Sequence, residues 1–388
     1  IVLYFWEKKM EKLNEDFIIN LSNNKGEPLW MKNFRLNSYK KFLELDNPSF
    51  GPKINIDFDN LVYHKGLFAP PSCSWENVDK KVKNTFNDLG VIEAENKYLK
   101  GVSNQYESEV VYHKMEESDG IIFLSTDEAL KKYPELFEKY FNNLVKYDEN
   151  KYTALNGALW SGGSFIYIPP YTKVDRPLQS YFRIDTKNLG QFERTIIIVD
   201  HDSSLHYIEG CTAKNYSTTS LHAGVVEIYV GKNSTCKYST IQNWSKDVYN
   251  LVTKRAILEE GAYMQWVDGN IGSGVTMKYP SCILKGDNSK ASSISIAYAK
   301  EGQHLDAGAK MIHLGKNTKS TIISKSIAGF GGTSDYRGTV KIAKEATGSF
   351  ATIKCDNIIL DNISSSNTYP KNIVENNEST LEHEATIS

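Results

Sequence analysis

The order of apolar and polar residues divides the chain into an N-terminal part with helical periodicity and a longer part without it. Two packed helices are predicted between residue 11 and about residue 45, with Pro28 in the first turn of the second, where a missing N–H costs nothing. Amphipathic helices are also predicted over 75–89 and 92–99, after a Pro/Gly/Asn-rich passage.

Two strand candidates and a further helix complete this first part. The strands are expected over 109–112 and 120–124, and the residues 125–128 open a helix that runs to about Tyr147. The pattern therefore predicts an N-terminal α/β domain, rich in helices, over residues 1–150.

From about Lys151 the pattern changes to short β-type runs separated by turns rich in Gly, Asn, Asp and Ser. The clearest runs are 164–168, 195–199, 225–230 and 321–324. A long series of strands with no helices between them excludes a doubly wound α/β sheet. The uneven turn spacing disfavours a propeller, while a sandwich and a β-helix both remain open for residues 151–360.

Residues 361–388 form the third predicted segment. Residues 361–380 are too polar for a core strand and predict a long loop, and the residues that follow predict the start of a helical segment.

Composition is that of an ordinary soluble protein of 388 residues, with 40% hydrophobic residues and a formal charge of -2. Neither nucleic acid nor a membrane is expected as a partner, because no basic surplus exists and the apolar opening at residues 1–6 is too short to span a bilayer. The five cysteines are far apart and form no Cys-x-x-Cys pair. A reducing compartment is expected, the cytoplasm first and the plastid stroma as the alternative.

Candidate metal ligands lie near the end of the chain. Cys355 is followed, after the polar passage, by Glu382, His383 and Glu384, which are side chains that iron and zinc accept. The zinc-protease helix His-Glu-x-x-His fails because position 387 is Ile. A capped helix with acidic residues in its first turn explains the same residues equally well.

Polar residues also interrupt the β region, at Arg183, Gln242, Trp244 and Lys254. A buried charge without a partner is costly, so these residues should be paired, exposed or functional. Cys211 ends a strand-like run at a turn, where a thiol is more easily approached, although a buried inert cysteine is the commoner case.

Several enzyme classes find no support in the chain. It contains no nucleophile elbow, Walker A loop or dinucleotide fingerprint, and Gly162–Gly163 fits no phosphate-cradling pattern. A carbohydrate-active enzyme on a β-helix would need paired carboxylates on one face, and no convincing pair is visible.

Seven blocks in order, from about Leu13 to the end, closely resemble the SufB scaffold proteins of the SufBD family, which act in iron–sulfur cluster assembly. The blocks are Trp160–Tyr167, Gly190–Thr195, Tyr207–Ala213, Thr240–Trp244, Val252–Ala256, Asp306–Met311 and Leu381–Ala385. The resemblance implies a mainly β fold, a right-handed parallel β-helix core behind an N-terminal α/β domain.

The resemblance also implies partners: the ATPase SufC, the paralogue SufD or a second SufB, a cysteine desulfurase system that supplies sulfur, and acceptor apo-proteins. The cargo is a nascent [2Fe–2S] or [4Fe–4S] cluster, with a reduced flavin as a further candidate. The chain itself is expected to be a scaffold and not an enzyme. The alternative is a structural subunit like SufD, which shares the fold without an assembly-site cysteine.

By the same resemblance, Cys211 is the sulfur acceptor, and Arg183, Gln242, Trp244 and Lys254 line its route. Nearby Lys254 or Arg183 is expected to lower the pKa of such a thiol. Asp185, where the family often has Asn, is left out of the site because of its negative charge.

Cys355 is by resemblance the assembly-site thiol, with Glu382, His383 and Glu384 as ligands or supports. A scaffold must release its cluster, which suits few thiolates plus His or carboxylate ligands, completed by a partner chain. The family continues beyond Glu-His-Glu-Ala with a helical segment that docks the ATPase. Here the sequence stops at Ser388, which puts ATPase binding in doubt.

Overall fold

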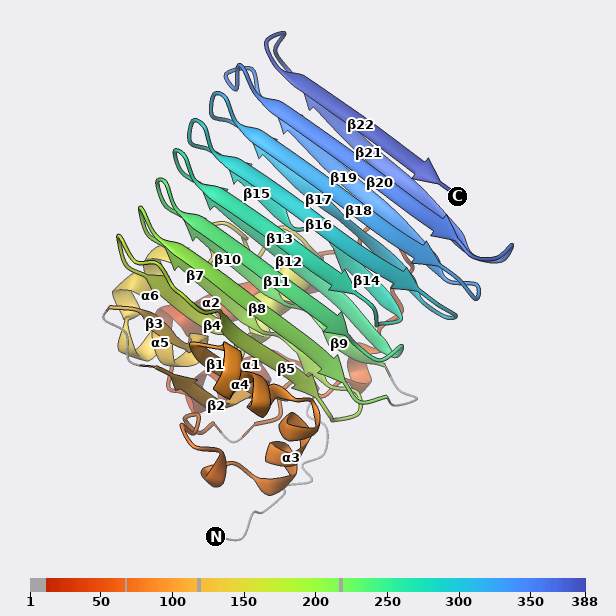
Figure 1. Ribbon diagram of the computed structural model, residues 1–388. Coiled ribbons are helices and arrows are strands. Elements are labelled where there is room, and N and C mark those ends of the chain that lie inside the picture. Colours follow the sequence, from red (N-terminus) through yellow and green to blue (C-terminus); the bar gives the residue numbers. More distant parts are fainter. Residues whose placement is uncertain (1–11, 67, 117–119, 216–218) are drawn as a thin grey trace.

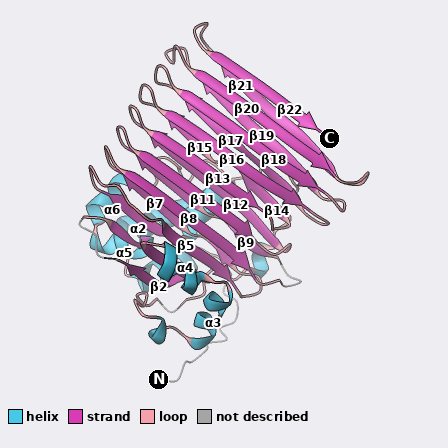
Figure 2. Cartoon of the chain, in the orientation of Figure 1, coloured by secondary structure: helices cyan, strands magenta, loops and turns pink. Residues whose placement is uncertain are grey.

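Two long parallel sheets, wound from one continuous chain, dominate the molecule, and helices gather around their N-terminal end (Figure 1). The computed structural model describes residues 12–66, 68–116, 120–215 and 219–388. Figure 2 shows the helices gathered at one end of the molecule and strands making up the rest. The expected mainly β fold, a parallel β-helix with an N-terminal helical region, is confirmed.

The helices all precede the β-helix coils. They are α1 Glu15–Lys25, α2 Leu29–Glu44, α3 Lys80–Asp88, α4 Val91–Tyr98, α5 Thr126–Lys132, α6 Pro134–Tyr140 and α7 Lys151–Leu159, with short 3₁₀ turns η1 Phe58–Asn60 and η2 Trp75–Asn77. The two predicted helices before residue 45 are confirmed. The helix expected up to Tyr147 is wrong in extent, because Pro134 starts a new helix after a break.

Along the β-helix the chain passes alternately through a first and a second sheet. The order of the first sheet is β2-β1-β5-β8-β11-β13-β16-β18-β20-β22. The strand bounds are β1 Gly101–Tyr106, β2 Glu109–Met115, β5 Leu178–Ile184, β8 Ser204–Ala213, β11 Thr235–Asn243, β13 Tyr263–Asn270, β16 Lys290–Ala299, β18 Lys319–Ala328, β20 Phe350–Ile359 and β22 Thr380–Ile387.

The second sheet follows the order β21-β19-β17-β14-β12-β10-β7-β4-β3, with β6, β9 and β15 beside it. Its strands are β3 Ile122–Ser125, β4 Ser164–Ile168, β6 Gly190–Gln191, β7 Arg194–Val199, β9 Ser220–His222, β10 Val225–Val230, β12 Val248–Leu258, β14 Val275–Lys278, β15 Ser281–Leu284, β17 His304–His313, β19 Thr333–Ile342 and β21 Ser365–Val374.

The N-terminal strands extend both sheets. β1 pairs in parallel with β5 and antiparallel with β2, and β3 pairs antiparallel with β4. The strands β1, β2 and β3 therefore extend the two sheets beyond the first coil, on its N-terminal side. The domain boundary near residue 150 stays a prediction.

Residues 361–388 correct the expected loop and helix start. They form the last coil, with β21 and β22 pairing in parallel with β19 and β20. Their polar character has a physical reason: the final coil has no further coil on its outer side, so most of its side chains are exposed. His383 and its neighbours accordingly lie on a strand, and the helix-cap reading of these residues is wrong.

Alternating side chains fill the β-helix interior. In β11, for example, Cys236, Tyr238, Thr240 and Gln242 are buried while the residues between them face outward. Three turns on one side of the β-helix place Asn233, Asn288 and Asn317 at φ values of 56°, 61° and 54°, a left-handed conformation that asparagine tolerates. No helix in the described part of the chain combines the length and apolar character that a bilayer crossing demands.

Candidate functional site

Cys211 lies inside the β-helix, near the end of β8. Parallel pairing sets it beside Phe182 of β5 on one side and Gln242 of β11 on the other. Its residue surface is 1% exposed, and Trp244 belongs to the same buried cluster. The structure thus brings Cys211, Gln242 and Trp244 together in one part of the interior.

A buried carboxylate stands between Cys211 and Lys254. Glu209 Oε1 lies 3.8 Å from Cys211 Sγ and accepts a hydrogen bond from Lys254 Nζ at 3.0 Å. The Tyr238 hydroxyl donates to the other carboxylate oxygen. Lys254, Glu209 and Tyr238 are each at most 1% exposed, so this ion pair sits in a low-dielectric interior.

A second polar group continues from Gln242. Its Oε1 accepts hydrogen bonds from Asn250 Nδ2 at 2.7 Å and from Lys278 Nζ at 3.3 Å. Lys278 also pairs with Asp268 at 3.0 Å. Because lysine only donates, these contacts fix the orientation of the Gln242 amide and leave its Nε2 without a partner among the described residues.

The protonation state of Cys211 differs from the sequence-based expectation. Burial raises the pKa of its thiol well above the ordinary value, and Glu209 and Glu193 raise it further, against the smaller effect of Lys254 and Lys278. Lys254 does act to lower this pKa, but burial and the two carboxylates outweigh it, so the expectation of a lowered pKa is wrong for this state. Cys211 is a protonated, protected thiol.

Arg183 does not join this interior group. It alternates with the buried Phe182 and Ile184 on β5, so it lies on the outer face. There it pairs with Asp185 at 2.6 Å and donates to Thr212 Oγ1 at 3.1 Å. Asp185, which the sequence analysis set aside for its charge, neutralises Arg183.

One row of interior side chains links the level of Cys211 to that of Cys355. Strand pairing aligns, in order along the first sheet, Glu209, Thr240, Asp268, Ser295, Ser324 and Cys355. Each is at most 7% exposed. We call this set the interior polar row; it runs through β8, β11, β13, β16, β18 and β20, which lie side by side in Figure 1.

Cys355 occupies the penultimate strand of that sheet and is fully buried. Burial raises the pKa of its thiol to about 11, although the neighbouring Tyr336 hydroxyl favours the thiolate. Its pairing partner on the last strand, β22, is Ala385. Like Cys211, Cys355 is protonated near neutral pH.

The acidic and imidazole residues of β22 face opposite ways. His383 pairs with the buried Ile353, so it shares the inward side with Cys355, and its Nδ1 lies 3.3 Å from Asn372 Nδ2. Glu384 lies opposite Lys354 on the outer side and pairs with it at 3.4 Å. Glu382 alternates with His383 and also faces outward. Across the described ranges, no three His, Cys, Asp or Glu side chains gather to hold a metal ion.

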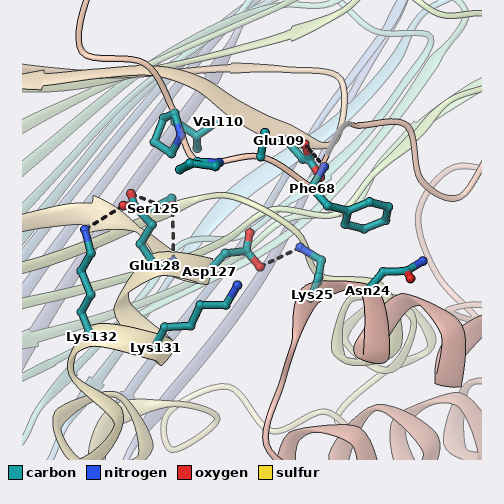
Figure 3. Close-up of a pocket in the computed structure, with 13 residues that line it drawn as sticks. Asn24, Lys25, Phe68, Glu109, Val110, Ser125, Asp127, Glu128, Lys131 and Lys132 are labelled. Carbon is teal, nitrogen blue, oxygen red and sulfur yellow. Dashed lines mark hydrogen bonds and ion pairs between the residues drawn. The ribbon is translucent and has the colours of Figure 1, made fainter. Parts of the chain in front are cut away.

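A separate cavity of about 260 Å³ lies among the N-terminal elements (Figure 3). Its carboxylates are satisfied locally: Glu109 accepts from the Phe68 N–H at 2.8 Å, and Glu128 pairs with Lys132 at 2.9 Å. Asp127 accepts from Lys25 Nζ at 2.7 Å. Because these charged groups pair with one another, we interpret the cavity as part of a packing interface between α1, β2 and α5. Neither Cys211 nor Cys355 lines it.

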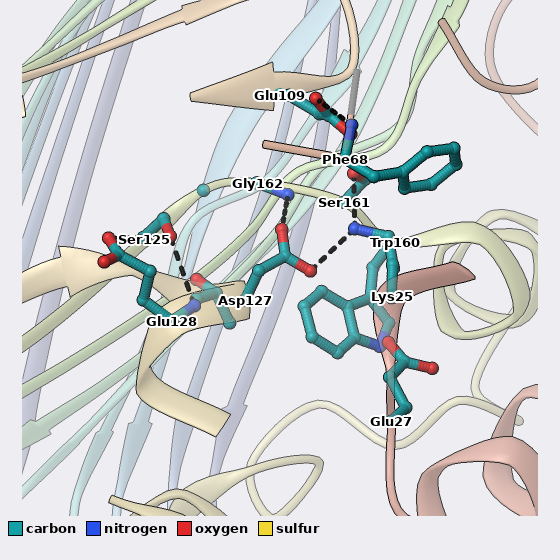
Figure 4. Close-up of polar contacts among 12 residues, drawn as sticks. Lys25, Glu27, Phe68, Glu109, Ser125, Asp127, Glu128, Trp160, Ser161 and Gly162 are labelled. Atoms are coloured by element: carbon teal, nitrogen blue, oxygen red, sulfur yellow. Dashed lines mark hydrogen bonds and ion pairs between the residues drawn. The ribbon is translucent and has the colours of Figure 1, made fainter. Parts of the chain in front are cut away.

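The same packing interface explains why glycines occupy positions 162 and 163, shortly after Trp160 (Figure 4). The Gly162 N–H donates to Asp127 Oδ2 at 2.7 Å, and Lys25 also donates to Ser161 Oγ at 2.8 Å. Gly162 has φ +70°, and a Cβ there would come within 2.1 Å of Gln105 Oε1. These glycines therefore serve close packing and not phosphate binding.

Sequence reasoning missed the carboxylates that pair with the interior lysines. Glu209 lies inside a block that the resemblance used, two residues from Cys211, but no motif marks it as part of a site. Asp268, Lys278 and Asn250 come from neighbouring coils, and only the strand register brings them together. Period-2 alternation puts Glu209 in phase with Leu205 and Tyr207, and Asp268 in phase with Met264 and Trp266, which is the sequence signal that points to them.

Comparison with known proteins shows the family of this chain. Residues 182–388 match the family model of the SufBD core domain of the SUF system for FeS cluster assembly, and residues 77–180 match that of the SufBD protein N-terminal region. The chain is 52% identical over 380 residues to the iron–sulfur cluster assembly protein SufB of Bacillus subtilis, which covers 97% of this chain and 82% of the relative. It is 53% identical, with the same coverage, to iron–sulfur cluster assembly SufBD family proteins of Staphylococcus saprophyticus and Staphylococcus aureus. The chain belongs to the SufBD family of iron–sulfur cluster assembly proteins.

Proposed function

We propose that this chain is a scaffold that accepts sulfur at Cys211 and assembles a nascent iron–sulfur cluster at Cys355. One observation supports this most strongly: both thiols face the same interior, and the interior polar row leads from the neighbourhood of one to the other. A structural subunit of the SufD type would not need the assembly-site thiol, Cys355.

Sulfur arrives as the outer atom of a donor persulfide from a cysteine desulfurase system. The Cys211 sulfur bonds to that atom, the donor S–S bond breaks, and the donor leaves as a thiol. Gln242, Trp244 and Lys254 surround the product, and Gln242 Nε2 and Trp244 Nε1 are buried N–H donors without partners among the described residues. An anionic persulfide would satisfy them, whereas leaving them unpaired costs about 1–3 kcal/mol each. Arg183 keeps a supporting role at the outer end of this route.

Onward transfer follows the interior polar row. Asn270 and Asn357 are the next inward positions after Asp268 and Cys355 on β13 and β20. Asn270 Oδ1 and Asn357 Nδ2 also lack partners among the described residues. Polar groups left open in this way favour water over a dry core, and the Asn357 Nδ2 donor can also bind anionic sulfur. Reduction of the transferred sulfur to sulfide takes two electrons, which a reduced flavin in the complex can supply.

At Cys355 the cluster is cargo and not a resident cofactor, as a [2Fe–2S] or a [4Fe–4S] unit. Cys355 supplies the thiolate and His383 the inward-facing imidazole, with Glu382 and Glu384 as outer supports that turn in if β22 rearranges. Since these residues form no closed ligand set, a partner subunit, SufD or a second SufB, completes the coordination. SufC supplies ATP hydrolysis, acceptor apo-proteins take the cluster, and the setting is the cytoplasm, with the plastid stroma as the alternative.

The test is anaerobic reconstitution with iron and sulfide in the presence of the partner subunits. Cys355→Ala should abolish the visible chromophore, and Cys73→Ala, which changes an exposed thiol, should retain it. If the Cys355→Ala protein takes up as much iron and sulfide as the unsubstituted protein, the assembly role of Cys355 is wrong.

A further inference from the structure

We propose that Glu209 takes the proton of the persulfide formed on Cys211 when sulfur is loaded there, so that one negative charge beside Lys254 moves from the carboxylate to the sulfur. This inference rests on the proposed role of Cys211 as sulfur acceptor. It assigns a chemical step to a residue that neither the motifs nor the comparisons single out.

The geometry places one oxygen at the centre of the exchange. Glu209 Oε1 lies 3.8 Å from Cys211 Sγ, 3.0 Å from Lys254 Nζ and 3.4 Å from Thr240 Oγ1. The thiol therefore points its proton at the same atom that holds the ammonium. A short shift of the lysine Nζ from oxygen to sulfur is enough to exchange its anionic partner.

Burial makes the charge balance strict. The ionisable groups that face this interior, from every element packed around Cys211, are Glu193, Glu209, Asp268, Lys254, Lys278, His222, Tyr207 and Tyr238. The acids are matched: Glu209 by Lys254, Asp268 by Lys278, and Glu193 by His222, whose Nε2 is 2.8 Å away. A persulfide anion would add a fourth negative charge, and an uncompensated buried charge is strongly unfavourable.

Neutralising Glu209 removes that cost. The donor R–S–SH reacts with the Cys211 thiol to give Cys211–S–SH and R–SH; one S–S bond breaks and one forms, with no net oxidation. A persulfide is a stronger acid than the parent thiol, so its proton then passes to Glu209 Oε1. Lys254 pairs with the outer sulfur, and the summed charge of the interior is unchanged.

The resting state fits this order of events. Burial acts to raise the pKa of Glu209, but Lys254 and Tyr238 hold it below the ordinary value, while the pKa of the Cys211 thiol is raised. The proton thus stays on sulfur until loading. Once Lys254 turns to the persulfide, burial raises the pKa of Glu209 and the carboxyl keeps the proton.

Difference infrared spectroscopy of the full chain, before and after loading with a low-molecular-weight persulfide, tests the proposal. Mass spectrometry of the Cys211 peptide verifies loading. We expect the C=O stretch of a protonated carboxyl to appear on loading and to be lost in Glu209→Gln. Glu227→Gln, which changes a buried carboxylate outside the interior polar row, paired with Arg194 at 2.8 Å, should keep the signal.

Heavy-carbon labelling of glutamate carboxyls makes the test independent of how the variants fold, because the labelled wild type should show the new band shifted. Two outcomes overturn the role of Glu209 alone. In the first, Cys211 carries the extra sulfur but no new carboxyl band appears. In the second, a band appears but glutamate labelling does not shift it. Folded protein in which Cys211 takes up no sulfur overturns the proposed acceptor role as well.

Discussion

Cys211 and Cys355 face the same interior side of one sheet, on strands β8 and β20. Five strand-to-strand steps separate them, which at the usual spacing is about 24 Å. No direct exchange between the two thiols is possible at this distance. Under the proposed roles of the two thiols, sulfur would move through the interior, and the polar side chains between the two cysteines are open to a direct test.

Filling the interior between the thiols should interrupt transfer. Ser324 neighbours Cys355 in the interior polar row, and Ser324→Leu places a bulky apolar side chain there. An added barrier of about 1.4 kcal/mol slows transfer about tenfold. We expect Cys211 to load normally and Cys355 to receive sulfur at least that much more slowly, as followed by peptide mass spectrometry.

Thr321→Leu is the matched control for this substitution, because Thr321 lies on the same strand and faces outward. It should leave the rate of sulfur arrival at Cys355 unchanged. Equal slowing by both substitutions would show that strand β18 tolerates neither change and would argue against an interior route.

Removing Lys254 alone should destabilise the fold. Lys254→Met leaves the buried Glu209 carboxylate without its cation, which costs about 3–5 kcal/mol in comparable sites. Adding Glu209→Gln to that variant should restore most of the free energy of unfolding, measured by chemical denaturation at neutral pH. A double variant no more stable than Lys254→Met would show that the two side chains are not coupled.

His313 should make the protein acid-sensitive. It is fully buried, its ring nitrogens lie 2.8 Å from Thr318 Oγ1 and Ser320 Oγ, and burial lowers its pKa from 6.5 to about 4. A lowered histidine pKa means that the unfolded chain takes up a proton before the folded chain does. Stability is therefore full above pH 6.5 and falls by about 3 kcal/mol between pH 6.5 and pH 4.

His313→Gln keeps hydrogen-bonding capacity without the titration. Its free energy of unfolding should change less than that of the wild type over the same pH interval, as measured by denaturation at several pH values. Parallel curves for the two proteins would mean that His313 does not contribute to the acid sensitivity.

The residue pattern predicts the strands of the β-helix, but it does not predict how these strands are arranged. Thr235 pairs with Tyr263, Tyr263 with Lys290 and Lys290 with Lys319, so successive coils differ in length and leave no fixed period in the sequence. Periodicity alone therefore left sandwich and β-helix open. It also missed α7, because all of its residues from Tyr152 to Leu159 are buried and no polar face marks a helix.

For the candidate site, too, the sequence identifies residues but not the contacts between them. Cys211, Gln242 and Lys254 could be named because each sits in a block shared with the family. Their actual contacts depend on register between coils, which places Glu209 against Lys254. Burial of Cys211, with the effect of Glu209 next, reverses the expected direction of the Cys211 pKa. Arg183 was assigned to the interior by resemblance, and strand alternation puts it outside.

The most direct test of the central claim follows one sulfur atom. Persulfide is supplied anaerobically to the wild type and to Cys211→Ser, and the mass of the Cys355 peptide is recorded over time. The account predicts that extra sulfur appears first on Cys211 and then on Cys355 in the wild type, and that Cys355 gains none in Cys211→Ser, although that variant still melts cooperatively and binds iron and sulfide on chemical reconstitution. Equal sulfur gain at Cys355 in both proteins would contradict it.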